Sequence, residues 1–181
     1  MGDRSQPAHL PRPGALSRPA HRLRQVWTVL WGAPRPWEWT VVTAYLTPAE
    51  ADLFRRLSPG DQRHSLDVFW RLVRAGQTER TLLAAALLHD IGKTAGRLRL
   101  WHRVVYVLLR RLWPGLLDRL AAPAPSGHWR HSLYILLHHQ EIGARLLART
   151  GSAEQVVALV AGDPATGPEG VDWLRWADDG V

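Results

Sequence analysis

Apolar positions recur at helical spacing from Thr47 to the end of the chain, and no segment shows the strict alternation of a half-buried strand. Capping signals divide this pattern into separate helices. Thr47-Pro48-Ala49-Glu50 is a capping box with proline at the first helical position, and Ser58-Pro59 opens the next segment in a similar way. We therefore predict an all-α fold, with helices over about 47–57, 58–75, 78–90, 98–113, 129–149, 152–162 and a last short one holding Trp173 and Trp176.

The segment at 78–90 differs from the others because its apolar residues do not keep to one face. Residues 82–88 are apolar all round, which predicts a buried helix. That helix ends in His89-Asp90. An unpaired buried Asp costs several kcal/mol, so a divalent metal or a salt bridge must compensate it. The nitrogen and oxygen donors of this pair suit a first-row divalent ion or magnesium.

Two more donors fall at inward or marginal positions of other predicted helices. His64 lies at the margin of the apolar arc that includes Val68 and Leu72. Asp178 follows Val171 and Leu174 at helical spacing, which places it on the apolar side of the last helix. Three or four protein ligands that leave room for water are typical of a catalytic metal site.

These residues also resemble a known family. His64, then His89-Asp90, then Asp178 is similar to the H…HD…D signature of the HD superfamily of metal-dependent phosphohydrolases, and residues 87–93 resemble its "HDIG" variant. Residues 139–144 resemble the "HPEIGA" element that follows in many HDIG-type proteins. The resemblance covers about residues 47–179.

The resemblance implies an HD-domain-like helical bundle around a metal site and a phosphohydrolase that uses a metal-activated water. His64, His89, Asp90 and Asp178 would bind a divalent ion (Mn, Fe, Ni, Mg or Zn). Asp90 would also orient the water, and Lys93 would offer a positive charge to the phosphate of a small, nucleotide-type monoester or diester.

Three other residues are candidates at this site. His139 shares an inward helical face with Leu136 and Gly143. In binuclear relatives the matching His contributes to a second metal, so His139 is a second-metal or substrate contact, or else a core histidine bonded to a carbonyl. Arg97 and Arg99 are candidate phosphate-binding residues.

The chain also departs from the family pattern. Residues 159–164 carry no His pair, the "GYP" tripeptide is missing, and no acidic pair follows the HD motif. The sequence thus predicts a mononuclear or a degraded site. The alternative function is a catalytically degraded HD-fold regulatory or binding module, with a basic Trp-rich surface for a membrane or a partner.

Composition limits the remaining choices. The 181 residues fit one domain, and six of the 13 Pro lie between Pro7 and Pro36, so we expect a basic, partly disordered tail over 1–39 and a helical domain over 40–181. The charge of +7 comes from 22 Arg and a single Lys, Lys93, which indicates coding bias, so nucleic acid is not a favoured partner.

The basic stretch 92–117 contains Trp101 and Trp113 and has no acid. It predicts either a peripheral contact with a membrane or a partner, or a solvated face over a core stripe. The absence of Cys excludes a disulfide scaffold, a thiolate metal site and a Cys nucleophile. With no apolar run near 18–20 residues and no secretory h-region, we expect a cytoplasmic protein.

Overall fold

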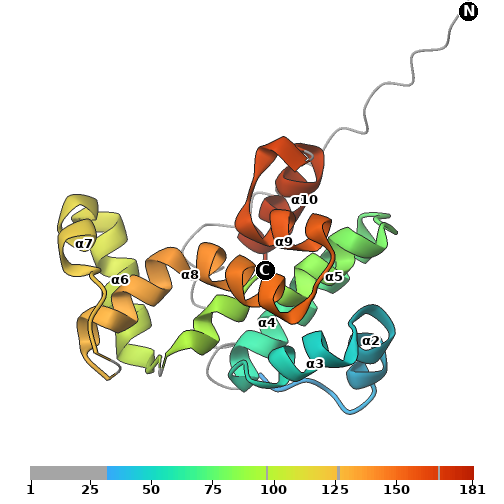
Figure 1. The fold of residues 1–181 in the computed structure, drawn as a ribbon, viewed down its shortest axis with the longest axis horizontal. Coiled ribbons are helices and arrows are strands. Elements are labelled where there is room, and N and C mark those ends of the chain that lie inside the picture. Colours follow the sequence, from blue (N-terminus) through green and yellow to red (C-terminus); the bar gives the residue numbers. More distant parts are fainter. Residues whose placement is uncertain (1–31, 97, 126, 167) are drawn as a thin grey trace, which may run out of the picture.

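The computed structural model describes residues 32–96, 98–125, 127–166 and 168–181. Within these ranges the chain contains helices and no strands, which confirms the all-α prediction. The elements are α2 (Glu38–Tyr45), α3 (Pro48–Arg55), α4 (Pro59–Arg74), α5 (Arg80–Leu88), η1 (Ile91–Ala95), α6 (Leu100–Leu112), α7 (Pro114–Leu120), α8 (Trp129–Thr150), α9 (Glu154–Ala161), η2 (Pro164–Thr166) and α10 (Pro168–Asp179) (Figure 1).

Helix ends follow the capping signals of the sequence. The Thr47 side chain accepts from the backbone N–H of Glu50, and the Glu50 carboxylate accepts from the N–H of Thr47, so α3 has its capping box. Ser58 caps α4 by accepting from the N–H of Asp61. At the other end of α8, Gly151 takes a left-handed conformation with φ +80°, which glycine adopts without steric cost.

Two elements differ from the predicted pattern. Pro114 ends α6 as expected, but it also begins a short helix, α7, because its fixed φ suits the first helical position. The long helix α8 is interrupted at His138, whose φ of −111° and ψ of 17° are not helical. The interruption divides α8 into two halves that pack against different parts of the molecule.

The main core surrounds α5. All seven residues from Leu82 to Leu88 are buried, as the apolar run predicts, and they pack with α2, α3, α4, α9 and α10. A second, smaller cluster lies at the left-hand end in Figure 1, where α6 and α7 pack on the first half of α8 around Leu117 and Leu133. Helix α8 therefore connects the main core around α5 to the smaller cluster formed with α6 and α7.

The folded part begins within the segment predicted as a tail. Residues 1–31 lie outside the described residues, but Glu38 is buried and its carboxylate accepts from Arg63 and from the indole N–H of Trp70. Trp39 packs edge-on against the buried ring of Phe54. The end of the segment predicted as a tail is thus held by the core of the domain.

Candidate metal centre

His64 and Asp178 meet although 114 positions separate them in the sequence. The second turn of α4 carries His64, and the last turn of α10 carries Asp178. The His64 Nε2 atom lies 2.8 Å from Oδ1 of Asp178, within hydrogen-bond distance. The packing of α10 on α4 therefore brings together two of the predicted ligands.

His89 and Asp90 stand at the end of α5, where the chain changes from the α-helix to η1. Both are buried, at 5% and 1% exposure. The Nδ1 atom of His89 lies 2.9 Å from the carbonyl oxygen of Ala86, which acts as acceptor and fixes the proton on Nδ1. The other ring nitrogen, Nε2, is buried and has no hydrogen-bond partner. An imidazole held in this way directs its Nε2 atom toward the site of a ligand.

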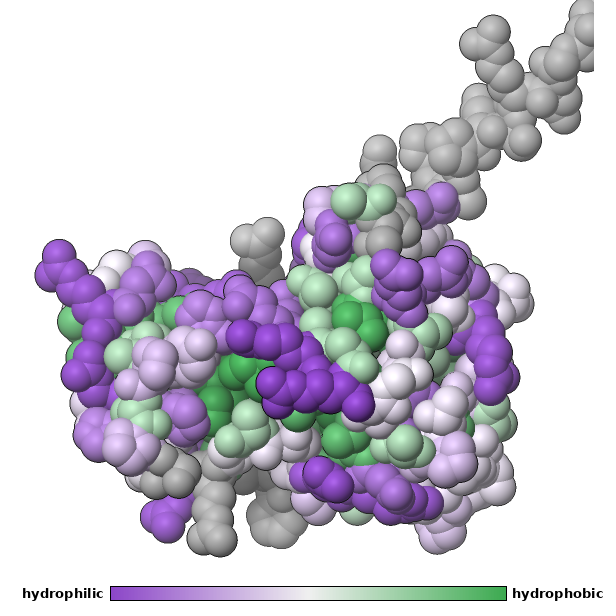
Figure 2. Space-filling model, viewed as in Figure 1, coloured by the Kyte–Doolittle hydropathy of each residue, from purple (hydrophilic) through white to green (hydrophobic). Residues whose placement is uncertain are grey.

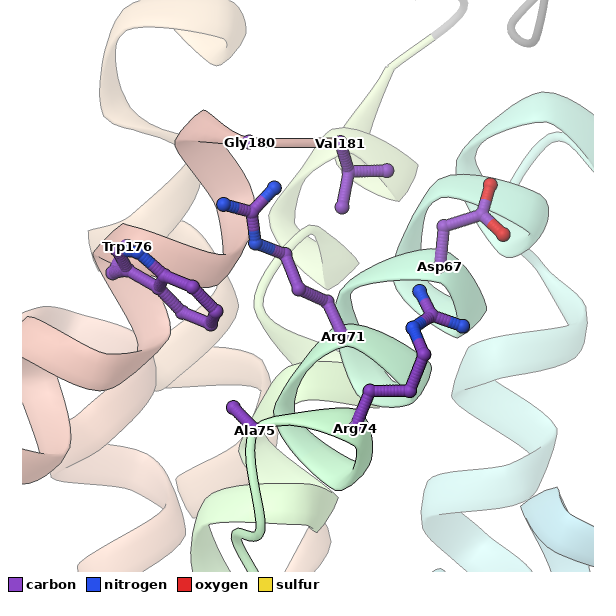
Figure 3. A pocket seen from close by; sticks show the side chains of 7 residues that line it. All are labelled: Asp67, Arg71, Arg74, Ala75, Trp176, Gly180 and Val181. Atoms are coloured by element: carbon purple, nitrogen blue, oxygen red, sulfur yellow. The ribbon is translucent and has the colours of Figure 1, made fainter. Parts of the chain in front are cut away.

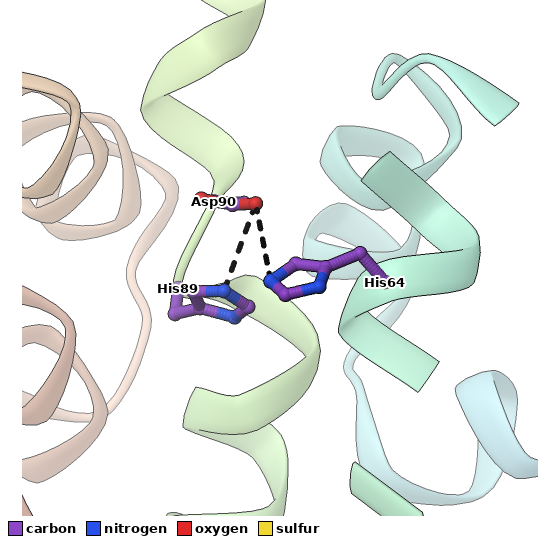
Figure 4. A group of neighbouring side chains, drawn as sticks. All are labelled: His64, His89 and Asp90. Atoms are coloured by element: carbon purple, nitrogen blue, oxygen red, sulfur yellow. Dashed lines mark ion pairs between the residues drawn. The ribbon is translucent and has the colours of Figure 1, made fainter. Parts of the chain in front are cut away.

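The Nε2 atoms of His64 and His89 converge with the carboxylates of Asp90 and Asp178. His89 Nε2 lies 3.6 Å from Asp90 Oδ2 and 3.7 Å from Asp178 Oδ1, and His64 Nε2 lies 3.9 Å from Asp90 Oδ2. Figure 4 shows the rings of His64 and His89 directed toward the Asp90 carboxylate. One donor atom from each of these three residues lies within 4.8 Å of the other two.

This donor set fits a divalent cation. Two imidazole nitrogens and two carboxylate oxygens are ligands of intermediate hardness, suited to zinc and to manganese, iron or nickel. The two carboxylates balance the charge of the ion, and the unpartnered His89 Nε2 would gain the partner that it lacks. Of these residues, His64, His89 and Asp90 lie close enough together to hold a metal ion.

Lys93 connects this cluster to a second carboxylate. Its Nζ lies 2.5 Å from Asp90 Oδ2 and 3.7 Å from Asp61 Oδ1. Both oxygens of buried Asp61 accept from the guanidinium of Arg103, at 2.6 and 2.7 Å. The chain Asp90–Lys93–Asp61–Arg103 extends the site from η1 to α6.

Sequence reasoning missed Asp61 and Arg103. Asp61 stands at the third position of α4, and the Ser58 hydroxyl lies 2.5 Å from its carboxylate, so helix capping gave a complete local explanation of this residue. Arg103 was one arginine in a basic stretch. No local signal pairs residues that are 42 positions apart.

His139 approaches the same carboxylate from the other side. Its Nδ1 lies 2.9 Å from the carbonyl oxygen of Leu136, and its Nε2 lies 3.6 Å from Asp90 Oδ1. His139 thus faces Oδ1 of Asp90, whereas His64 and His89 face Oδ2. The neighbouring His138 is partly exposed, and its Nδ1 atom lies 3.7 Å from Oε1 of Glu141. Asp163, the acidic residue in the stretch without a His pair, is exposed.

The electrostatics of the cluster follow from burial and charge together. Burial by itself favours a neutral His89, but the carboxylates of Asp90 and Asp178 outweigh it and raise the pKa of His89 to about 9. Burial also opposes ionisation of Asp90, yet Lys93 and the surrounding imidazoles hold the pKa of that carboxyl well below its ordinary value. Without a metal, the positive charges of Lys93 and a protonated His89 neutralise the carboxylates.

A small cavity of about 180 Å³ opens beside Lys93, and its basic lining residues are Arg56, Lys93 and Arg103. The two arginines predicted to contact phosphate do not contribute to this lining. Arg97 lies outside the described residues, and Arg99 is exposed just before α6.

A larger cavity of about 520 Å³ lies between α4 and α10 (Figure 3). There the Arg71 guanidinium stacks over the Trp176 ring, 4.2 Å from its centroid. Neither cavity is lined by a candidate metal ligand, but the smaller one includes Lys93, which contacts Asp90, so we assign the chemistry to the smaller one.

No protein-family model, curated protein or solved structure matches this chain. The described part of the chain also has no helix with the length and apolar character needed to cross a bilayer.

Proposed function

We propose that this protein is a metal-dependent phosphohydrolase of the HD type, acting on a nucleotide-type phosphomonoester or phosphodiester. The observation that supports it is the convergence of two imidazole nitrogens and two carboxylate oxygens from three separate helical elements, one of those nitrogens buried without a partner.

His64, His89, Asp90 and Asp178 would hold the ion. When bound, a divalent ion there lowers the pKa of a coordinated water and polarises a phosphoryl oxygen. The hydrogen bond from His89 to Ala86 keeps that ring in the orientation required of a ligand. Asp178, with 45% of its side chain exposed, marks the side of the site that solvent and substrate reach.

The charges of the site favour an anionic substrate. Three carboxylates (Asp61, Asp90 and Asp178) stand against the two cations Lys93 and Arg103. With a divalent ion bound and neutral imidazoles, one positive charge remains in excess. Lys93 and Arg103 place that charge along the small cavity, where a phosphate group would bind.

The test is hydrolysis by the manganese-loaded protein of p-nitrophenyl phosphate, bis(p-nitrophenyl) phosphate and a panel of nucleoside phosphates. Asp178→Asn removes a ligand from a half-exposed position and leaves the core intact. Asp179→Asn, one residue further on and exposed, is the matched control. We expect a loss of about 100-fold or more in kcat for Asp178→Asn, and a change within about twofold for the control. Equal rates in the two variants, or no turnover with any divalent ion, would overturn the proposal.

A binding module without turnover is the second candidate. The observation in its favour is the 2.5 Å contact between Lys93 and Asp90 Oδ2, since Lys93 neutralises the same oxygen that a metal would use. A wild-type protein that binds no divalent ion and hydrolyses none of these substrates would favour this candidate.

A further inference from the structure

The exposed apolar side chains of this protein are concentrated on α6 and α7. Within the described residues, eleven large apolar side chains are exposed, and eight of them lie between positions 100 and 116. They are 43–60% exposed, and they are Leu100, Trp101, Val104, Val107, Leu108, Leu112, Trp113 and Leu116. A soluble protein rarely leaves so many apolar side chains together on one surface without a partner.

Helical geometry shows that these residues form one continuous stripe on α6. At about 100° per residue, the six apolar residues from Leu100 to Leu112 span an arc of roughly 140°. Val105 and Leu109 adjoin one edge of this arc and pack on Leu117 and Leu133 in the small cluster. Only one edge of the apolar surface of α6 is therefore covered, and we name the exposed remainder the outer stripe.

Positive charge lies beside the outer stripe and, at Arg111, within its arc. Arg99, Arg110 and Arg111 are exposed along α6, and Arg119 is exposed on α7. Between Asp90 and Glu141 the sequence contains a single acid, Asp118. Arg103 is already paired with Asp61, so the other four arginines are the ones that face solvent. In Figure 2, apolar and strongly hydrophilic side chains lie side by side at the end of the molecule formed by α6 and α7.

We propose that the outer stripe docks on the surface of an anionic phospholipid bilayer, with α6 lying in the plane of the interface. An apolar stripe with tryptophan, bordered by arginines and free of acid, matches the chemistry of that surface. A second copy of this chain would bring arginine against arginine, because a two-fold contact pairs the same patch with itself.

The first test uses the absence of cysteine from the chain. Leu108→Cys places a single thiol on the outer stripe, and Arg145→Cys places one on an exposed part of α8. Each full-length variant carries an environment-sensitive nitrobenzoxadiazole probe and is mixed with vesicles of phosphatidylcholine and phosphatidylglycerol (3:1). We expect a blue shift and increased emission at position 108 and no change at position 145.

The second test separates the outer stripe from the basic residues before position 32, which would also attract anionic vesicles. Arg110→Gln with Arg111→Gln removes two charges beside the stripe, and Arg145→Gln with Arg149→Gln removes two from exposed positions elsewhere. Each arginine near the surface contributes about fivefold to binding, so the first pair should weaken vesicle pelleting about 20-fold. The second pair should change it less than threefold, and all variants should keep the wild-type circular dichroism.

Three results would overturn the proposal. One is a probe at position 108 that does not respond to anionic vesicles. Another is an equal loss of binding in the two arginine pairs, which would assign binding to overall charge. The third is a probe that is already buried without vesicles. A dependence of that burial on protein concentration would indicate a second copy of the chain, and independence would indicate its own N-terminal segment.

Discussion

Gly92→Ala should destabilise the protein by about 3 kcal/mol or more, because no side chain fits where η1 meets α8. A Cβ atom on Gly92 would lie 1.9 Å from the carbonyl oxygen of His139 and 2.8 Å from the backbone nitrogen of Gly143. Ordinary contact begins near 3.4 Å, so one backbone must move by about 1.5 Å. Overpacking of flexible side chains costs about 1–3 kcal/mol, and here both obstacles are backbone atoms, which yield less.

The same movement would change the candidate site. His139 lies directly opposite Gly92, and its Nε2 is 3.6 Å from Asp90 Oδ1, so a shift of α8 separates this pair. The assay is urea unfolding of the metal-free protein. Gly115→Ala on α7 is the control, since a Cβ there meets nothing within 4 Å, and alanine should leave stability unchanged or raise it by up to about 1 kcal/mol. A Gly92→Ala protein within about 0.5 kcal/mol of wild type would refute the close approach of the two backbones.

Two further predictions concern charge. Since the pKa of His89 is about 9 in the folded metal-free protein and 6.5 ordinarily, its proton stabilises the fold below pH 6.5, and this effect is lost as the pH rises through 9. Urea titrations should therefore show the free energy of unfolding falling by up to about 3 kcal/mol between pH 6.5 and 9. His89→Gln should remove this fall. A rise in the free energy of unfolding over the same range would contradict the raised pKa of His89. Arg103→Gln leaves buried Asp61 without its two short contacts and should cost about 3 kcal/mol in thermal or urea unfolding. Arg175→Gln, which breaks an exposed pair, should cost less than about 0.5 kcal/mol, and equal losses would show that Asp61 tolerates solvation.

Local signals predicted much of the fold. The capping box at Thr47 led directly to α3, because its hydrogen bonds lie within one turn of helix. The uninterrupted apolar run before His89 led to the buried α5, because a helix that is apolar all round must be covered on every side. Helical spacing also indicated that His64 and Asp178 face inward, and the structure places their side chains 2.8 Å apart.

The rest depends on contacts that local patterns do not record. The pairing of Asp61 with Arg103 joins two helices, and each residue had a sufficient local explanation of its own. The sequence also left two interpretations of the basic stretch 92–117 open, since helical spacing identifies an apolar face without showing what covers it. The structure shows that α6 covers only one edge of its apolar surface, at Val105 and Leu109, and leaves the rest exposed.

The central claim is that the His/Asp cluster binds a divalent ion, and metal content tests it most directly. The measurement is equilibrium dialysis of the full chain against manganese, followed by elemental analysis of the wild type, Asp178→Asn and Asp179→Asn. The site predicts about one ion per chain in the wild type and in Asp179→Asn, and a loss of most of it in Asp178→Asn. No bound ion in the wild type, or equal binding in both variants, would show that Lys93 and a protonated His89 hold the cluster together without a metal.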